Sequence, residues 1–150
     1  MAKSEINIGV LGGAGYVGLV TGVGLAALGH KVVSQDIDQN RLEMLSDARS
    51  AVYEDGLEPI LRQLIDIDQI SFTDDQPETI RSSDAVFIAV GTPSLADGAA
   101  DLSAVIAVAE QLRDEISKYT VVVVKSTVPV GTIDVVTDIL SQKLTIGEDF

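Results

Sequence analysis

The sequence predicts an α/β fold in which helices cover both faces of a doubly wound parallel sheet. Short apolar runs of strand length alternate along the chain with segments of helical length. Two of these runs, Ala85–Val90 and Val121–Val124, are apolar at every position, which is typical of parallel strands buried on both faces. The valine run in particular predicts a central strand, not an edge. The composition, with 46% hydrophobic but only 4% aromatic residues, suits β-branched strands under closely packed helices.

The first unit, Ile6–Asp36, has the order strand, glycine-rich turn, helix, strand. Gly13, Gly15 and Gly18 form a G-x-G-x-x-G pattern where the first strand meets a helix predicted over Gly15–Leu28. The first glycine permits a tight turn, the second lets the backbone approach a pyrophosphate, and the third lets the helix pack on the strand. Glycine-rich turns also occur for packing alone, but a strand, a helix and a closing acid in register favour a dinucleotide site.

Asp36 is that closing acid. It follows the predicted strand Lys31–Gln35 and comes about 20 residues after Gly15, the spacing at which a carboxylate meets the adenosine ribose hydroxyls. A carboxylate accepts a hydrogen bond from a 2′-hydroxyl but repels a 2′-phosphate, and the adjoining Ile37 and Asp38 offer no cation to offset this repulsion. The sequence therefore predicts NAD rather than NADP as the cofactor.

The remaining elements complete a Rossmann-type sheet with strand order 3-2-1-4-5 and right-handed crossovers. Gly22 and Gly24 in the first helix are interpreted as points of close approach to the sheet. Asp38 and Asp101 are the expected N-caps of two helices. The other predicted segments are a helix ending at Ser46, a turn at Tyr53–Gly56, a helix Leu57–Ile65, a strand Ile70–Thr73, a short helix Pro77–Arg81, and helices Leu102–Ser117 and Thr132–Leu140.

Two loops follow apolar strands at the edge of the sheet where such folds bind ligands. Gly91–Pro93 ends one strand, so Thr92 is either a ligand contact or part of a plain turn. Lys125–Gly131 ends the valine strand. Arg41, five residues after Asp36, lies over the adenosine or is an ordinary surface arginine, and spacing alone leaves both open.

Charge and composition exclude several classes of binding partner and site. The net charge of −13, with only 10 Lys and Arg, predicts no nucleic-acid partner and no anionic membrane partner. The absence of cysteine excludes disulfides, thiolate metal sites and a cysteine nucleophile within this chain, and no metal site is predicted. At 150 residues the chain is expected to be a single domain. With neither a leader-like segment nor an apolar run of about 20 residues, it is expected to be cytoplasmic.

The glycine pattern Gly13–Gly18, the turn Gly91–Pro93 and the run Lys125–Gly131 together resemble one family, the UDP-glucose/GDP-mannose dehydrogenases. The resemblance is to their N-terminal NAD-binding domain and extends from Ile6 to Phe150. It implies oxidation of a sugar C6 alcohol to a carboxylate in two steps, with two NAD reduced and a thioester on a cysteine. UDP-glucose is the expected nucleotide sugar, and a homo-oligomer is implied for the parent enzyme.

The resemblance also implies roles for individual residues. Backbone groups of Tyr16 and Val17 would contact the pyrophosphate and Asp36 the ribose, whereas Arg41 would lie at the adenosine end. Thr92 and Thr127 would lie on the nicotinamide side, with Thr127 also near the reacting centre as the candidate catalytic residue.

The chain also departs from the family pattern. Gly12 replaces an apolar residue and is expected to loosen the end of the first strand. Ala51 and Asp55 stand where relatives often carry prolines.

A further implication concerns length. In the family a sixth strand, beyond Phe150, pairs with Val121–Lys125, and the cysteine-bearing sugar domain follows. In the 150-residue chain the valine strand would then be an unpaired edge that promotes self-association. Two alternatives remain: the cofactor domain of a β-hydroxyacid or 6-phosphogluconate-type dehydrogenase, and a non-catalytic NAD-sensing module.

Overall fold

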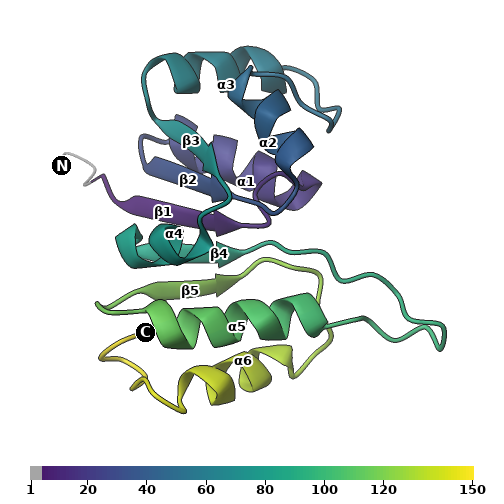
Figure 1. Ribbon diagram of the computed structural model, residues 1–150, viewed down its shortest axis with the longest axis vertical. Coiled ribbons are helices and arrows are strands. Elements are labelled where there is room, and N and C mark those ends of the chain that lie inside the picture. The colour runs from purple at the N-terminus through teal and green to yellow at the C-terminus, as the bar shows by residue number, and fades with distance from the viewer. Residues whose placement is uncertain (1–4) are drawn as a thin grey trace.

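A computed structural model describes residues 5–150 and contains one five-stranded sheet with the order β3-β2-β1-β4-β5 (Figure 1). All four neighbouring pairs are parallel, so the carboxyl ends of the strands meet at one edge of the sheet. This confirms the predicted Rossmann-type order 3-2-1-4-5. The strands are β1 Asn7–Leu11, β2 Lys31–Gln35, β3 Ile70–Thr73, β4 Ala85–Ile88 and β5 Val121–Val124.

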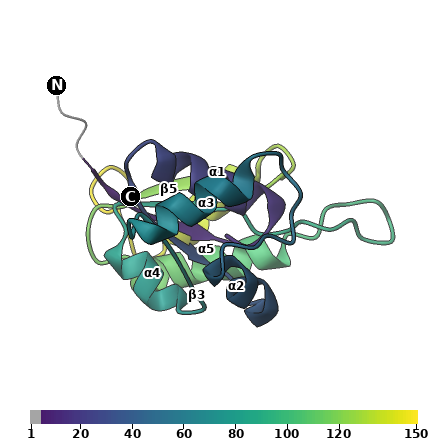
Figure 2. The same cartoon turned by 90° about the horizontal axis from the view of Figure 1, so that it is seen from above.

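Helices cover both faces of this sheet. Figure 2 shows α1 and α3 on one side of the strands and α4 and α5 on the other. Alternate side chains of β1 serve the two faces, because Val10 belongs to the apolar cluster under α1 and α3, and Leu11 to the cluster under α4, α5 and α6. The helices are α1 Tyr16–Ala27, α2 Gln39–Ser46, α3 Leu57–Asp66, α4 Gln76–Ser82, α5 Ser103–Glu115 and α6 Thr132–Leu140.

The glycines of α1 show how closely it lies on the sheet. A Cβ added at Gly22 would lie 3.0 Å from Oγ of Ser34 in β2, which confirms the predicted close approach. At Gly24 an added Cβ would meet nothing within 4 Å, so the same prediction is wrong there. Two residues along a helix is more than half a turn, and Gly24 therefore faces solvent when Gly22 faces the strand.

Helix caps agree with the sequence to within a residue. Asp38 accepts the N–H of Arg41 at 3.2 Å and caps α2 as predicted. The Asp101 carboxylate accepts the N–H of Ser103, but the N-cap position itself is Leu102, so α5 starts one residue later than expected. The strand expected to reach Val90 ends at Ile88, although the N–H of Ala89 still donates to the carbonyl of Leu11 at 2.8 Å.

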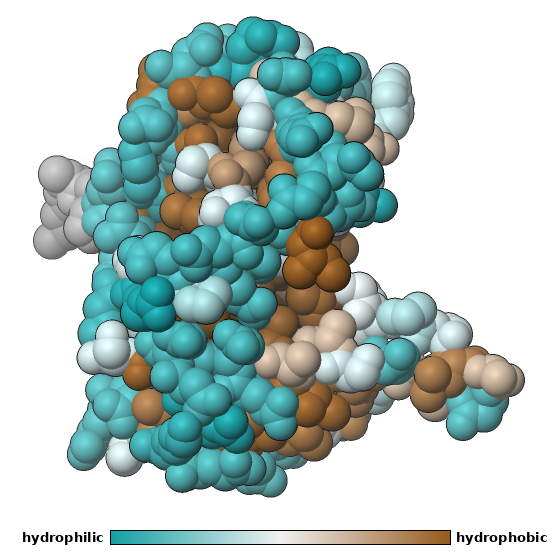
Figure 3. All heavy atoms as spheres, in the orientation of Figure 1, coloured by the Kyte–Doolittle hydropathy of each residue, from teal (hydrophilic) through white to brown (hydrophobic). Residues whose placement is uncertain are grey.

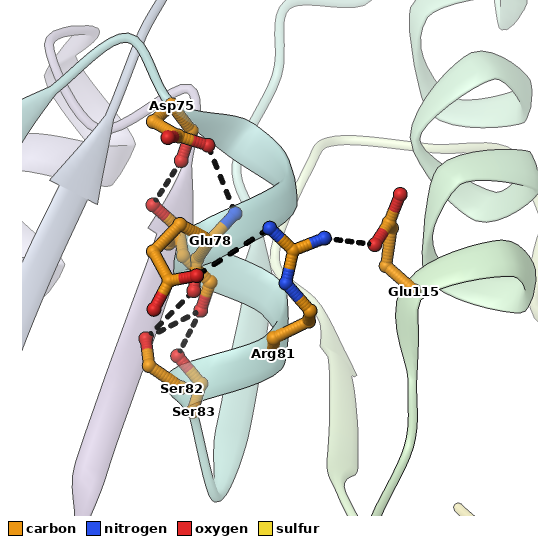
Figure 4. Close-up of polar contacts among 7 residues, drawn as sticks. Asp75, Glu78, Arg81, Ser82, Ser83 and Glu115 are labelled. Atoms are coloured by element: carbon orange, nitrogen blue, oxygen red, sulfur yellow. Dashed lines mark hydrogen bonds and ion pairs between the residues drawn. The ribbon is translucent and has the colours of Figure 1, made fainter.

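Side-chain contacts fix α4 beside α5 (Figure 4). The Arg81 guanidinium lies 3.4 Å from the Glu78 carboxylate on its own helix and 2.5 Å from that of Glu115 on α5. Asp75 caps α4 by accepting the N–H of Glu78, and the Ser83 hydroxyl donates to the carbonyl of Thr79. These contacts matter for the site because α4 and α5 each contribute a stretch of its wall, as described below.

The valine strand lies at the edge of the sheet within residues 5–150, which confirms the edge expected for the 150-residue chain. The prediction of a central strand, made from the apolar run alone, is wrong for these residues. Among residues 5–150, β5 has β4 as its one strand neighbour, and Val121 is 45% exposed. Val122 and Val124 still pack into the cluster under α5 and α6. Side chains that helices bury make a strand apolar whether it has one neighbouring strand or two. The sequence pattern therefore cannot distinguish an edge strand from a central one.

This edge is covered only at its beginning. The carbonyl of Asp149 accepts the N–H of Thr120 at 2.9 Å, and Phe150 packs against the cluster under α5 and α6. The N–H of Val121 donates to the carbonyl of Asp84, directly before β4, and that of Lys125 to the carbonyl of Ile88 in β4. By strand alternation the backbone groups of Val122 and Val124 therefore face the open side.

We expect the 150-residue chain to self-associate through this open edge, increasingly so as salt screens its net charge of −13. Sedimentation equilibrium at low and high salt measures the association, with Val123→Lys as the matched variant that places a charge on the edge. A monomer at every salt concentration, or association that the lysine leaves unchanged, would contradict this expectation.

Candidate functional site

A cavity of about 580 Å³ opens at the carboxyl ends of the strands. In Figure 3 it corresponds to the hollow with exposed apolar surface between the half of the molecule that carries α2 and α3 and the half that carries α5. Its wall is built from the glycine-rich turn, the ends of β2, β4 and β5, and the helices α2, α4 and α5. The lining residues are Gly12, Gly15, Tyr16, Val17, Gln35, Asp36, Ile37, Arg41, Gln76, Ala89, Val90, Gly91, Thr92, Ala104, Ala107, Val108, Ser126 and Thr127.

The predicted glycines divide into two roles. Gly15 lines the cavity, whereas Gly13 and Gly18 pack beneath it. A Cβ added at Gly13 would lie 2.7 Å from Cβ of Ser34, and one at Gly18 would lie 2.2 Å from the carbonyl oxygen of Gly12. Side chains are thus excluded at both positions by the close packing of turn, helix and strand, as the G-x-G-x-x-G pattern predicts.

Gly12 is a residue whose importance sequence reasoning missed. Its φ of +82° favours glycine, and an added Cβ would lie 2.7 Å from the carbonyl oxygen of Ala89. The N–H groups of Gly12 and Gly13 both donate to the carbonyl of Gln35, at 3.0 and 2.8 Å. The expectation that Gly12 loosens the end of β1 is therefore wrong, because only a glycine allows this turn to lie against β4 and β2.

Backbone donors at the start of α1 face the cavity. The first i to i−4 bond of the helix runs from the N–H of Leu19 to the carbonyl of Gly15, so the N–H groups of Tyr16 and Val17 precede the helical ladder. Both residues line the cavity. Free N–H groups together with the positive end of the helix dipole make this a place where an anion can bind.

Asp36 lies next to the glycine-rich turn at the end of β2. Its Oδ2 accepts the N–H of Ala14 at 3.0 Å and its Oδ1 accepts the N–H of Asp38 at 3.1 Å. Two backbone donors therefore hold a partly buried carboxylate at the cavity wall. Each carboxylate oxygen has a second lone pair, which leaves acceptor capacity for hydroxyl groups of a ligand.

Arg41 lines the same end of the cavity and is paired with a neighbour. Its Nε lies 3.3 Å from Oδ2 of Asp38, and its side chain is 47% exposed. Arg41 is thus an exposed arginine that lines the cavity, and its contact with an adenosine stays a prediction.

The two strand-end loops meet on the opposite wall. The hydroxyl of Thr92 donates to the carbonyl of Thr127 at 2.8 Å, and the two threonine Oγ1 atoms are 3.2 Å apart. The hydroxyl of Ser126 donates to the carbonyl of Val90 at 2.7 Å. The two threonines singled out in the sequence thus form one hydroxyl pair that lines the cavity.

Several residues that line the cavity were not predicted from the sequence. Ala104 and Ala107 on α5 are three residues apart, so they share a helix face, and their small side chains keep this wall open. Gln35 and Gln76 lie where β2 ends and α4 begins. The alanine spacing was a usable signal, whereas nothing in the sequence distinguishes these two glutamines from others.

A hydrogen bond of 2.6 Å joins the hydroxyl of Tyr16 to Oε2 of Glu54 in the segment between α2 and α3. The bond and the carboxylate charge raise the pKa of Tyr16 above its ordinary value. The folded protein therefore favours the neutral phenol, and this contribution to stability is present below about pH 10 and lost as pH rises through the folded pKa.

We expect ultraviolet titration of the three tyrosines to show one that ionises later than the others. Glu54→Gln should bring that step to lower pH and Tyr16→Phe should remove it. Tyr53→Phe, which removes an exposed tyrosine beside Glu54, is the matched control and should leave the late step in place. A late step that survives Tyr16→Phe would assign it to another residue.

Comparison with known proteins identifies the family. The family described as UDP-glucose/GDP-mannose dehydrogenase, NAD binding domain, matches residues 6–150. The chain belongs to this family. NAD is therefore its cofactor. The structure suits such a dinucleotide, because it has a glycine-rich turn, free N–H groups in the first turn of α1 and the Asp36 carboxylate held at the cavity wall.

Individual relatives agree with this membership. UDP-glucose 6-dehydrogenase of Rhizobium meliloti is 46% identical over 131 residues, which cover 87% of this chain and 30% of that protein. The enzyme of the same name from Pseudomonas aeruginosa is 47% identical over 85% of this chain and 28% of its own length. A UDP-glucose dehydrogenase structure from Pyrobaculum islandicum superposes with a TM-score of 0.88 at 40% identity, covering 95% of this chain and 34% of that one. The chain thus spans about a third or less of each relative.

Residues 5–150 contain no helix that is long and apolar enough to cross a membrane. Within the same range, no cluster of three or more His, Cys, Asp or Glu side chains is arranged to hold a metal ion.

Proposed function

We propose that this chain is the NAD-binding domain of a nucleotide-sugar 6-dehydrogenase, with UDP-glucose as the sugar nucleotide that the complete enzyme oxidises at C6. The observation that carries the proposal is a single cavity with phosphate-binding backbone and Asp36 on one wall and the Thr92–Thr127 hydroxyl pair on the other. The relatives named UDP-glucose 6-dehydrogenase support the choice of substrate.

Backbone groups of this chain would bind the pyrophosphate of the cofactor. The N–H groups of Tyr16 and Val17 would donate to the pyrophosphate, and Gly13, Gly15 and Gly18 would let the backbone come close to it. Each hydrogen bond to a charged phosphate is worth about 1.5–3 kcal/mol.

At the adenosine end the ligands are side chains. Asp36 would accept the ribose hydroxyls through the lone pairs that its backbone partners leave free. Arg41 would lie along the adenosine, and its planar guanidinium suits stacking on a base.

The opposite wall would serve the reacting end. When bound, NAD accepts a hydride from the substrate carbon. Thr92 would orient the nicotinamide side, and Thr127 is the candidate catalytic residue because its hydroxyl, 3.2 Å from that of Thr92, can hold a water or substrate hydroxyl there. Thr92 also donates to the carbonyl of Thr127, which fixes both loops before any ligand binds.

Other predictions from the sequence complete the proposal. The parent enzyme would be a homo-oligomer, as the resemblance to the family implies. The high negative charge supports the absence of a nucleic-acid partner. A cytoplasmic location and the organisation of residues 1–150 as a single domain remain predictions.

The alternatives differ in what the chain would do. A β-hydroxyacid or 6-phosphogluconate-type dehydrogenase would share the cofactor domain but act on another substrate, and an NAD-sensing module would bind NAD without turnover. The family match favours the first proposal over both.

Calorimetric titration of the chain with NAD and with NADP tests the cofactor role, and we expect NAD to bind more tightly. Incubated alone with UDP-glucose and saturating NAD, the chain should form no NADH, because it contains no cysteine for the thioester route. A chain extended to the length of the relatives should form two NADH per UDP-glucose. Tighter NADP binding, or turnover by the 150-residue chain, would contradict the proposal.

A further inference from the structure

Asp38 connects the two charged residues at the adenosine end of the cavity. Its N–H donates to Oδ1 of Asp36 at 3.1 Å, and its own Oδ2 lies 3.3 Å from Nε of Arg41. Asp36 and Arg41 both line the cavity, whereas Asp38 is not one of its lining residues. The three residues therefore form one connected set in which the Arg41 side chain is paired with the Asp38 carboxylate.

Helix capping accounts for only half of this arrangement. Asp38 caps α2 through Oδ1, which accepts the N–H of Arg41 at 3.2 Å. Asparagine caps a helix as well as aspartate does, so the cap does not require a charge. The second oxygen contacts the side chain of Arg41, and since the two side chains are 40% and 47% exposed, this ion pair contributes little to folding. Its main consequence is where the arginine charge lies.

The net charge of Asp36, Asp38 and Arg41 at this end of the cavity is negative and would repel a phosphate. Asp36 and Asp38 supply two negative charges and Arg41 one positive charge, and the arginine is shared with a carboxylate. A guanidinium without such a partner binds phosphate oxygens with two parallel N–H donors. Removing Asp36 alone would leave Arg41 still neutralised by Asp38.

We propose that Asp38 is a specificity-determining residue that holds and neutralises Arg41, so that a dinucleotide with a 2′-phosphate is rejected even when Asp36 is replaced. The inference rests on the proposed role of the cavity in binding the adenosine half of NAD. It makes Asp36 a direct barrier to the 2′-phosphate and Asp38 an indirect one that acts through Arg41.

Four variants test this proposal by calorimetric titration with NAD and NADP: Asp36→Ser, Asp36→Ser with Asp38→Asn, and each of these with Arg41→Gln added. Asp36→Ser alone should still bind NADP weakly. Adding Asp38→Asn should tighten NADP by about tenfold, the scale of one charge-assisted hydrogen bond. With Arg41→Gln present, Asp38→Asn should give no such gain.

The variants that carry Arg41→Gln distinguish the proposal from a simple effect of removing a negative charge. An equal gain in NADP affinity with and without Arg41 would show that Asp38 merely repels the phosphate, and no gain in either background would also overturn the proposal. Asparagine preserves the cap, and circular dichroism and thermal melts confirm that each variant is folded. Asp38→Asn in the otherwise unaltered chain offers a milder test, in which NADP should gain affinity relative to NAD.

Failure of this inference is distinguishable from failure of the proposed function. If the unaltered chain binds NAD but the double variant gains no NADP affinity, the role of Asp38 is wrong and the cofactor role stands. If the unaltered chain binds neither dinucleotide, the proposed function fails first.

Discussion

Gly18→Ala is expected to lower the free energy of unfolding by about 1–3 kcal/mol and to weaken NAD binding at least tenfold. The new Cβ would lie 2.2 Å from the carbonyl oxygen of Gly12 and 2.9 Å from Cα of Gly13. Both atoms belong to the backbone, so relief requires the glycine-rich turn or α1 to move. Because the N–H donors of Tyr16 and Val17 begin that helix, any such movement displaces them from the cavity wall.

Gly24→Ala in the same helix is the matched control. Nothing lies within 4 Å of its added Cβ, and alanine in a helix interior is favoured over glycine by about 0.5–1 kcal/mol. Urea denaturation should therefore show opposite changes in stability for the two substitutions, and calorimetry should show unchanged NAD affinity for Gly24→Ala. Equal destabilisation by both variants would mean that the close packing of turn and helix is not the cause.

Asp36→Ala is expected to weaken NAD binding by about 10- to 100-fold and to leave the weak binding of NADP less affected or improved. The substitution removes the acceptor for ribose hydroxyls and the negative charge that repels a 2′-phosphate. It also leaves the N–H of Ala14 without its 3.0 Å partner, so the turn itself loses a tether.

Asp138→Ala controls for the loss of one negative charge. Asp138 is exposed on α6, which contributes no residue to the cavity, so this variant should bind NAD as the unaltered chain does. Isothermal titration of both variants with NAD and NADP makes the comparison. If NADP affinity fell as far as NAD affinity in Asp36→Ala, the carboxylate would be a structural tether and not the discriminating group.

The sheet order and the place of the site were predictable because they follow from local patterns. The alternation of strands and helices with short loops allows few topologies, and parallel strands bring their carboxyl ends to one edge. Asp36, Thr92 and Thr127 therefore meet at one cavity although they are far apart in the sequence.

Other features depend on contacts that no local pattern encodes. The requirement for glycine at position 12 comes from a positive φ and from the backbone of Ala89, directly after β4, and both arise only in the folded chain. The valine strand reads as central because the pattern reports buried side chains, whereas an edge is defined by backbone partners. The bond between Tyr16 and Glu54 is likewise invisible in the sequence, since both residues are polar and lie on separate segments.

The tethering of the glycine-rich turn has a thermodynamic consequence for cofactor binding. The N–H groups of Gly12 and Gly13 are held by the carbonyl of Gln35, and that of Ala14 is held by Asp36. A free glycine segment would lose much conformational entropy on binding, which would subtract from the affinity. Here the turn is preorganised, so most of the interaction free energy between the backbone and the pyrophosphate is retained as affinity.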